Sequence, residues 1–241
     1  MNFYGKTDVG KLRHSNQDDF AILKLPDDSI LAVVCDGMGG ANAGNVASKN
    51  ATQIIVSFFE RSYRNGLDSQ GVIALLQSAI VSANIEIFNM AQKNNELEGM
   101  GTTVVATFIS NDFIVVSHVG DSRAYLVNDG ITQLTRDHSV VQSLIESGKL
   151  SPAEARVHPR RNVITRALGI ESEILVDSLD LKRNGDEIVI LCTDGLSNFI
   201  TEEEIKEIAQ NNAAEEAADI FIKHANNNGG ADNITVVVLG S

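Results

Sequence analysis

Several aspartates stand directly after long apolar runs, where a buried strand would end. The clearest case is LAVVCDGMGGANAG (residues 31–44), in which Asp36 follows an apolar run that is β-branched in its middle. Asp194-Gly195 follows a similar run in DEIVILCTDG, and Asp121 closes the run in FIVVSHVGDSR. Carboxylates gathered at strand ends would repel each other and resist desolvation unless something neutralised them. A hard divalent cation does so, and carboxylate plus backbone carbonyl oxygen is the ligand set for Mg²⁺ or Mn²⁺.

An Asp-Gly pair is weak evidence for a metal site by itself, because this dipeptide is common in turns. Asp129-Gly130 joins two short strand-like runs in AYLVNDGITQL, and we expect it to form an ordinary hairpin turn. The glycines after Asp36 would instead let the backbone turn sharply and approach a ligand closely. The metal-site hypothesis therefore depends on the aspartates taken together.

The composition is that of a soluble globular protein with a proper core. The chain has 241 residues, of which 43% are hydrophobic and 21% are charged. The formal net charge of −13 argues against a nucleic-acid-binding surface. We expect no apolar run of membrane-spanning length and no signal segment, which predicts a cytoplasmic protein that does not bind membranes. Cys35 and Cys192 lie in strand-like runs and are expected to be small core hydrophobes.

Hydrophobic periodicity predicts strands and helix pairs in alternating groups. The expected strands are residues 2–9, 21–25, 31–35, 102–110, 113–120, 123–127, 131–134 and 186–193, with a last core strand after the Gly-rich turn near the end of the chain. Short connections between several of them imply antiparallel pairing. The expected helices are at about 45–61, 69–93, 201–209 and 214–225, the third opening on a Thr N-cap with a Glu at the third helical position. This pattern favours an α+β fold.

Residues 137–170 differ in character from the rest. They contain two short helical pieces, a Ser-Pro start and a basic cluster, and they lack a strong apolar stripe. We interpret them as an inserted, mobile flap beside the site, the alternative being a plain surface excursion. No internal repeat or domain boundary is evident, so we expect a single domain over residues 1–241.

Eight sequence blocks, in order, resemble those of the metal-dependent protein phosphatases, the type 2C Ser/Thr phosphatases, and the chain looks like a compact bacterial member. The blocks are RHSNQD, VCDGMGG, GMGTTVVA, VGDSRAY, LTRDHS, NVITRALG, LCTDGL and GGADNITVVV, and they extend over residues 13–238. The resemblance implies a β-sandwich of two antiparallel sheets flanked by helix pairs, a four-layer α/β/β/α arrangement. It also implies a binuclear metal centre at one end of the sandwich.

The resemblance implies roles for individual residues at that centre. Asp36 would bridge both metal ions, and the Gly37 carbonyl would bind the second. Asp194 and Asp232 would hold the first.

Three further roles come from the same resemblance. Asp18 would hold a water on the second metal, which leaves Asp19 without a metal role. Asp121, together with Asp194, would form a weaker third site. Arg13 would grip the substrate phosphate, for which its planar guanidinium is well matched.

The implied activity is hydrolysis of phosphoserine and phosphothreonine on proteins, reversing a bacterial Ser/Thr kinase. Water activated at two Mn²⁺ or Mg²⁺ ions would attack phosphorus directly, without a phospho-enzyme. Phosphorylated proteins and a cognate kinase are the expected partners of a monomer. Many eukaryotic relatives have His where this chain has Met38, and bacterial ones often have His where it has Ala41. The general acid is therefore open, with metal-bound water the leading candidate.

Two other interpretations fit the residues less well. A thiol phosphatase needs an Arg separated from its nucleophilic Cys by five intervening residues. At that spacing Cys35 is followed by Ala41 and Cys192 by Asn198, so neither fits. A catalytically weak relative that only binds phosphoproteins would be marked by loss of Asp36 or another metal aspartate, and all are present.

The remaining basic side chains have ordinary explanations. The five histidines show no metal-ligand spacing, and His118 is expected to be a core residue within a strand. His158 lies in the expected flap and is interpreted as a surface residue. Arg160 and Arg161 are expected to form a basic surface turn, the alternative being contact with phosphoprotein charge.

Overall fold

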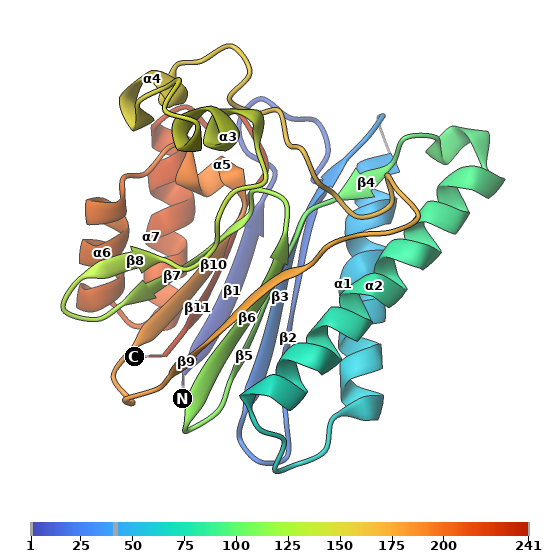
Figure 1. Ribbon diagram of the computed structural model, residues 1–241. Helices are drawn as coiled ribbons and strands as arrows, with labels where there is room; N and C mark the ends of the chain where they lie inside the picture. The colour runs from blue at the N-terminus through green and yellow to red at the C-terminus, as the bar shows by residue number, and fades with distance from the viewer. Residues whose placement is uncertain (1, 41–42, 241) are drawn as a thin grey trace.

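Two antiparallel β-sheets pack face to face in the computed structural model, which describes residues 2–40 and 43–240 (Figure 1). The first sheet contains, in spatial order, β1 (Phe3–Asp8), β11 (Ile234–Leu239), β10 (Ile188–Cys192), β7 (Arg123–Val127) and β8 (Ile131–Gln133). The second sheet contains β2 (Asp18–Lys24), β3 (Ile30–Met38), β5 (Val104–Ile109), β6 (Phe113–Val119) and β9 (Asp177–Lys182), and β4 (Gly101–Thr102) pairs with β3.

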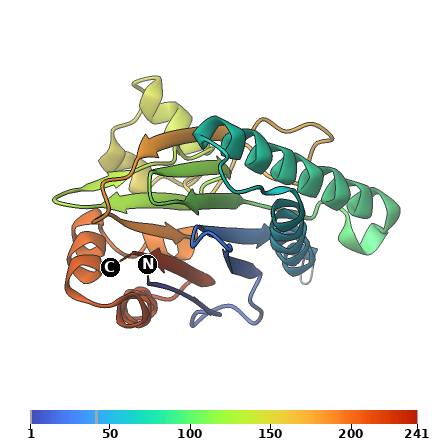
Figure 2. The same ribbon diagram turned by 90° about the horizontal axis from the view of Figure 1, so that it is seen from below.

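A pair of helices covers the outer face of each sheet. Helices α1 (Ala43–Ser62) and α2 (Ser69–Lys93) pack on the second sheet, and α6 (Glu202–Asn211) and α7 (Ala214–Asn227) pack on the first. Figure 2 shows these pairs on opposite sides of the two sheets. Short helices complete the chain: η1 (Asn95–Leu97), α3 (Val140–Glu146), α4 (Pro152–Arg156) and α5 (Asp194–Ser197). The expected α+β sandwich with flanking helix pairs is confirmed.

Alternation along the central strands explains their uninterrupted apolar runs. In β3, Leu31, Val33 and Cys35 pack against the helices, while Ile30, Ala32 and Val34 pack against the other sheet. Both faces are buried, so both sets of alternate positions must be apolar. Continuing this alternation places Asp36 on the face that points between the two sheets, where the apolar run ends.

One edge of the sandwich gathers the strand ends that carry the aspartates. β2 begins opposite the end of β3, where Asp18 pairs with Asp36. β10 ends opposite the beginning of β11, where Cys192 pairs with Val236. In Figure 1 this is the upper edge, which α3 and α4 lie above, while both chain termini lie at the opposite end.

Three local predictions are confirmed. Asp129-Gly130 lies in the turn of the β7–β8 hairpin, in which Val127 pairs with Ile131. The segment 137–170 contains two short helices, α3 and α4. Thr201 caps α6 through a capping box, in which its hydroxyl accepts from the Glu204 N–H and the Glu204 carboxylate accepts from the Thr201 N–H.

The sequence interpretation missed β9 and set the end of β3 too early. The β9 sequence DSLDLK places two aspartates in an edge strand of six residues that is only half-buried, so it lacks a clear apolar run. β3 continues beyond the apolar run through Met38, because β4 supplies a partner for Gly37 and Met38. Asp36 therefore lies inside a hydrogen-bonded strand, not in the turn that follows it.

Helix α2 corrects the expectation that no apolar run reaches membrane-spanning length. Among the described residues, α2 is the one helix that is long and apolar enough to cross a membrane, with a mean hydropathy of 1.6 over its best window. Of that window, 39% is buried inside the protein. Val72, Leu76, Ile80 and Ile87 form its buried stripe against α1 and the second sheet, so core packing accounts for the apolar character of this stripe.

Candidate metal centre

Asp18 and Asp36 face each other across neighbouring strands. They are register partners in the β2–β3 ladder, so both side chains point to the same face of the sheet. That face is the interior of the sandwich, since Phe20 and Ile22 of β2 pack between the sheets. Two carboxylates directly opposite each other destabilise a strand pair when both are charged. A bound cation would remove that penalty.

The Asp18 carboxylate reaches across to the other sheet. Its Oδ2 accepts hydrogen bonds from the hydroxyls of Thr193, at 2.9 Å, and Thr235, at 2.7 Å. Its Oδ1 is buried and has no hydrogen-bond partner among the described residues. An unpartnered buried carboxylate oxygen is costly unless a cation or water satisfies it. The arrangement therefore fits an oxygen-ligated divalent ion beside Asp18.

Asp194 and Asp232 come from the other sheet at the same edge. Asp194 is the first residue of α5, and Asn198 donates to its Oδ2 at 3.1 Å. Asp232 lies just before β11 and accepts from the Arg13 guanidinium at 2.8 Å. Arg13 itself is exposed, with 52% of its side chain accessible. The predicted phosphate-binding residue thus lies next to a predicted metal ligand.

Burial and mutual repulsion raise the pKa values of this carboxylate group. Burial raises the pKa of Asp36 well above its usual range, and Asp18, Asp194 and Asp121 add repulsion. Burial raises the pKa of Asp18 to about 7, of Asp121 to about 8 and of Asp194 to about 6. Asp232 contributes repulsion to Asp36, Asp18 and Asp194. The five predicted aspartates therefore form one electrostatically coupled cluster.

Gly37 occupies a place where no side chain fits. A Cβ atom there would lie 2.1 Å from the carbonyl oxygen of Gly44 and 2.6 Å from that of Gln17. The Gly37 N–H also donates to the Gln17 carbonyl at 3.1 Å. Glycine is required because three backbone segments meet beside Asp36.

The predicted non-ligand, Asp19, lies outside the aspartate cluster. Asp19 points to the opposite face of β2 from Asp18, and the Thr52 hydroxyl of α1 donates to its carboxylate. Met38 lines a small pocket of about 140 Å³ with Arg166 and Ile174. Ala41, the other departure from the family pattern, lies outside the described residues.

Some residues that build the site were not identified from the sequence. Asn233 accepts from the Gln17 N–H at 2.8 Å and donates to the carbonyls of Val9 and Ser15, which fixes the loop between β1 and β2. Its position directly after Asp232, in the block GGADNITVVV, was the available signal. Thr193 and Thr235 gave no signal, because their role requires the two sheets to face each other.

The histidine prediction was partly wrong. His118 is buried within β6, as expected. However, His118, His138 and Asp177 place one potential ligand atom each within 4.8 Å of one another. This cluster was missed because Asp177 begins β9, the strand that the sequence interpretation did not find.

Neither cysteine is suited to nucleophilic chemistry. Both are fully buried. Burial raises the pKa of the Cys35 thiol well above its usual range and that of Cys192 to about 12. Since the thiolate is the reactive form, these thiols are inert, in agreement with the rejection of a thiol phosphatase.

Without added metal, the protein is expected to become less stable as the pH rises from 6.5 to 8.5. The raised pKa values of Asp18, Asp36 and Asp121 mean that the folded chain holds protons that the unfolded chain has lost. The free energy of unfolding then falls by about 1.4 kcal/mol per pH unit for each carboxyl that is protonated only in the folded state. Thermal melting in chelator across this range measures the effect.

Mn²⁺ provides the internal control for this pH series. An ion that binds the ionised carboxylates reverses the trend, so melting temperature in Mn²⁺ should hold or rise from pH 6.5 to 8.5. The pH series begins at 6.5 because, at lower pH, the lowered pKa values of His118 and His138 make stability rise with pH, which opposes the effect of the carboxyls. A melting temperature in chelator that rises with pH would contradict the prediction.

Comparison with known proteins agrees with this geometry. The family model described as protein phosphatase 2C matches residues 13–231. A Listeria innocua protein named serine/threonine phosphatase stp is 39% identical over 97% of this chain and 93% of its own length.

Solved structures give the same answer. The chain resembles the serine/threonine phosphatase Stp1 from Staphylococcus aureus with a TM-score of 0.93 and 34% identity, covering 99% of this chain and 94% of that one. It resembles the catalytic domain of the phosphatase PstP, solved with two manganese ions, with a TM-score of 0.85 and 32% identity, covering 98% and 96%. From this agreement of sequence, fold and carboxylate cluster, the chain belongs to the protein phosphatase 2C family.

Proposed function

We propose that this protein is a metal-dependent phosphatase that hydrolyses phosphoserine and phosphothreonine on proteins. The observation that carries the proposal is the Asp18–Asp36 pair between the sheets, with a buried, unpartnered Asp18 oxygen and raised pKa values. Such a group of carboxylates needs cations to be stable in its ionised form. The relatives of this chain that are named Ser/Thr phosphatases support the same activity.

In this proposal the aspartates divide between two tightly held Mn²⁺ or Mg²⁺ ions. Asp36 would contribute to holding both ions, Asp194 and Asp232 would hold the first, and the Gly37 carbonyl and Asp18, through a water, would serve the second. Asp121 and Asp194 would hold a third, weaker ion. When bound, the ions supply an activated water and stabilise charge on the phosphoryl oxygens. The PstP relative solved with two manganese ions supports the first two sites.

The surface beside the aspartates is suited to a phosphorylated segment. One pocket of about 470 Å³ is lined by Arg13, Asp232, Arg156 and Arg161. An adjoining pocket of about 460 Å³ lies between α3, α4 and α5, and its lining includes Asp121 and Asp194. Arg156, Arg161, Asn198 and Phe199 line both pockets.

This continuity changes the interpretation of the basic turn. Arg161 lines both pockets, which supports the alternative that the basic turn contacts phosphoprotein charge over the plain surface turn that was expected. Arg13, Arg156 and Arg161 all line the pocket of about 470 Å³, and their guanidinium groups match the geometry and charge of phosphate. We propose that residues 137–170 act as a flap on a single catalytic domain and contact the substrate through these side chains.

Replacing Arg13 by Lys is expected to weaken binding of phosphosubstrates. Lys keeps the charge but loses the planar fork, so a charge-assisted hydrogen bond of about 1.5–3 kcal/mol is removed or distorted. Steady-state kinetics on a phosphopeptide should show a raised KM, and calorimetry should show nearly unchanged Mn²⁺ affinity. Unchanged kinetics would return Arg13 to the role of a surface residue that pairs with Asp232.

The decisive test of the function is hydrolysis of a phosphoserine peptide by the purified protein with Mn²⁺, and then with excess chelator. Turnover that requires metal supports the proposal, and turnover that survives chelation contradicts it. The proposed partners are phosphorylated proteins and the Ser/Thr kinase that phosphorylates them. We also propose that the protein is cytoplasmic and that it is a monomer. Sedimentation at several protein concentrations would test the monomeric state.

A further inference from the structure

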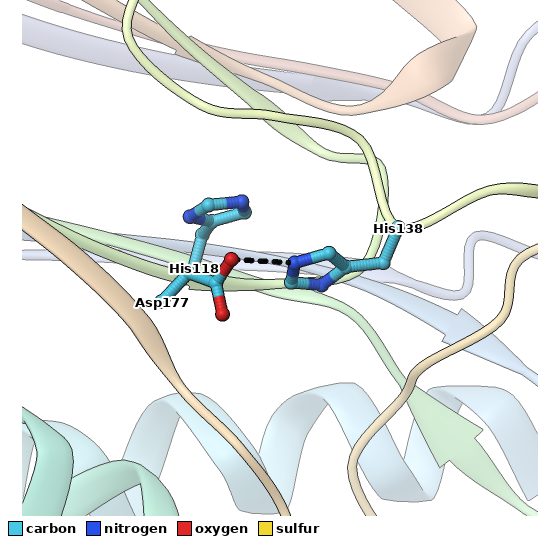
Figure 3. Close-up of side chains that lie close together, drawn as sticks. All are labelled: His118, His138 and Asp177. Carbon is cyan, nitrogen blue, oxygen red and sulfur yellow. Dashed lines mark hydrogen bonds and ion pairs between the residues drawn. The ribbon is translucent and has the colours of Figure 1, made fainter. Parts of the chain in front are cut away.

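A second polar cluster lies beside the metal centre, where β6, β9 and the base of segment 137–170 meet. Figure 3 shows His138 pointing at Asp177, with the His118 ring alongside. His138 Nε2 lies 3.2 Å from Asp177 Oδ2, and Arg166 donates to Asp177 Oδ1 at 2.7 Å. The His118 and His138 rings stack at a centroid distance of 4.8 Å and an angle of 15°. His118 and Asp177 are register partners in the β6–β9 ladder.

The hydrogen bonds assign the tautomer of His138. The Gly120 N–H donates to His138 Nδ1 at 3.0 Å, so this nitrogen must carry a lone pair. The proton of the neutral ring is then on Nε2, from which it is donated to Asp177. Arg166 Nη1 also lies 3.1 Å from Nε2, but a guanidinium only donates, so with the proton on Nε2 this is a close contact and not a hydrogen bond. Burial lowers the pKa of His138, although Asp177 opposes this, which favours the neutral ring.

A metal ion at this cluster is not required by its charges. The Arg166 guanidinium already neutralises Asp177 and also donates to the Leu175 carbonyl at 3.1 Å. His138 Nδ1 is occupied by Gly120, and His118 Nε2 donates to the Arg136 carbonyl at 2.9 Å. Here a carboxylate orients a histidine that in turn holds another group, and residues outside the ligands of a metal ion position those ligands in this way.

The group that His138 holds is the turn that carries Asp121. The backbone N–H of His138 donates to the Gly120 carbonyl at 2.9 Å, reciprocating the bond from Gly120 to Nδ1. Gly120 has φ +107°, and a Cβ there would lie 2.6 Å from the Thr103 side chain. The turn is therefore pressed against Thr103, in a backbone conformation that favours glycine.

The other side of the turn is held in a similar way. Arg123 makes a bidentate pair with Asp137, at 2.7 Å from Nη2 and 3.0 Å from Nε. Ser122 shares a hydrogen bond of 2.7 Å with the Thr103 hydroxyl, which accepts from the Asp36 N–H. The residues on both sides of Asp121 are thus held by one segment: His138 binds Gly120, and its neighbour Asp137 binds Arg123.

We propose that His138, oriented by Asp177 and Arg166, is a positioning residue that fixes the Gly120–Asp121 turn and so sets the third metal site. The inference rests on the proposed function, because it takes Asp121 to be a ligand of that site. His138 also lies at the base of segment 137–170, where its carbonyl accepts from the Thr165 N–H at 2.8 Å. The same residue therefore joins the base of this segment to the turn.

Three substitutions at one position test the proposal. Asn carries its side-chain oxygen at the δ position, so His138→Asn can still accept from the Gly120 N–H. Gln carries its polar atoms one bond further out, and Ala carries none. We expect His138→Ala and His138→Gln to weaken the weakest of three Mn²⁺ sites by about 10-fold to 100-fold. Both variants should lower kcat and leave KM and the two tight sites unchanged. His138→Asn should keep most of the metal affinity at the weakest site and most of kcat.

Calorimetric Mn²⁺ titration and steady-state kinetics are the measurements, with His224→Ala as the matched control. His224 lies on α7 beside Glu204, at 3.3 Å, and should be silent in both. Nitrogen-15 NMR of the histidine side chains should place the His138 proton on Nε2. A proton on Nδ1, equal impairment of the Asn and Gln variants, or an unchanged weak site in His138→Ala would each overturn the proposal.

A parallel Mn²⁺ titration of Asp121→Ala separates the third metal site from the positioning role of His138. If it leaves the weakest site and kcat unchanged, the third-site part of the proposed function is wrong and the inference fails with it. If it removes the weakest site while the His138 variants keep it, only the positioning role is wrong. Should His138→Ala fail to fold, the Asn and Gln variants decide the result alone.

Discussion

Replacing Asp36 by Asn is expected to abolish phosphatase turnover while leaving the fold intact. Asp36 lies near the end of β3 on the face between the sheets, directly opposite Asp18. In the proposed function it is the one side chain that touches both tightly held ions. We expect a loss in kcat of about 10³-fold or more, which corresponds to about 4 kcal/mol of transition-state stabilisation. Phosphopeptide kinetics in saturating Mn²⁺ measures it.

The stability of the Asp36→Asn variant should separate a lost site from a lost fold. The substitution removes one of several repelling carboxyls, so without metal the variant should melt at or above the temperature of the unchanged protein. Its gain in melting temperature on addition of Mn²⁺ should largely disappear, because that gain reflects binding to the folded state.

Asp19→Asn is the matched control for this substitution. Asp19 is the neighbouring carboxylate on β2, but it points to the helix side, where Thr52 donates to it. The turnover of Asp19→Asn and its gain in melting temperature on addition of Mn²⁺ should match those of the unchanged protein. A fully active Asp36→Asn variant would contradict the assignment of Asp36 to the metal centre.

The sequence predicted the layers because the strands are buried on both faces. Runs such as residues 31–35 and 188–192 are apolar at every position, and the structure shows alternate positions packing on opposite sides. The apolar runs end at the functional edge, which is why Asp36 and Asp194 could be identified from the residues alone. Where the alternation weakens, as in β9, the interpretation failed.

The contacts among the eight sequence blocks could not be predicted from their order. Residues of VGDSRAY and LTRDHS bind each other, since Gly120 pairs with His138 and Arg123 with Asp137. The two blocks are separated by the β7–β8 hairpin, and only its closure brings them together. Likewise, Thr235 meets Asp18 only because β11 and β2 belong to facing sheets.

Assembly of the site from two facing sheets also explains why it destabilises the folded protein. Asp18 lies in the interior and relies on two threonine hydroxyls from the opposite sheet for one oxygen, while the other oxygen has no partner among the described residues. Polar groups buried in this way reduce the free energy of unfolding. Their retention at a strand end, against that cost, is expected of a functional site rather than a structural one.

Replacing Asp121 by Ala is expected to lower turnover selectively. Asp121 lies in the turn after β6, lines the pocket between α3, α4 and α5, and has a pKa raised to about 8, first by burial and then by Asp194. In the proposed function it serves only the third, weaker ion, whereas Asp194 serves two. Asp121→Ala should therefore keep two tightly bound Mn²⁺ ions and lose the third. The fall should be mainly in kcat, by about 10²-fold, as expected for an interaction gained in the transition state.

Asp129→Ala is the matched control, because Asp129 is the aspartate of an ordinary Asp-Gly hairpin turn at the surface. It should bind three ions and turn over as the unchanged protein does. Calorimetric titration beside steady-state kinetics gives both quantities for the two variants. An Asp121→Ala protein with unchanged kcat would leave Asp121 as a turn residue. One that cannot hold even two ions would place Asp121 in the binuclear centre itself, since the loss of a ligand used only by the third ion cannot empty the other two sites.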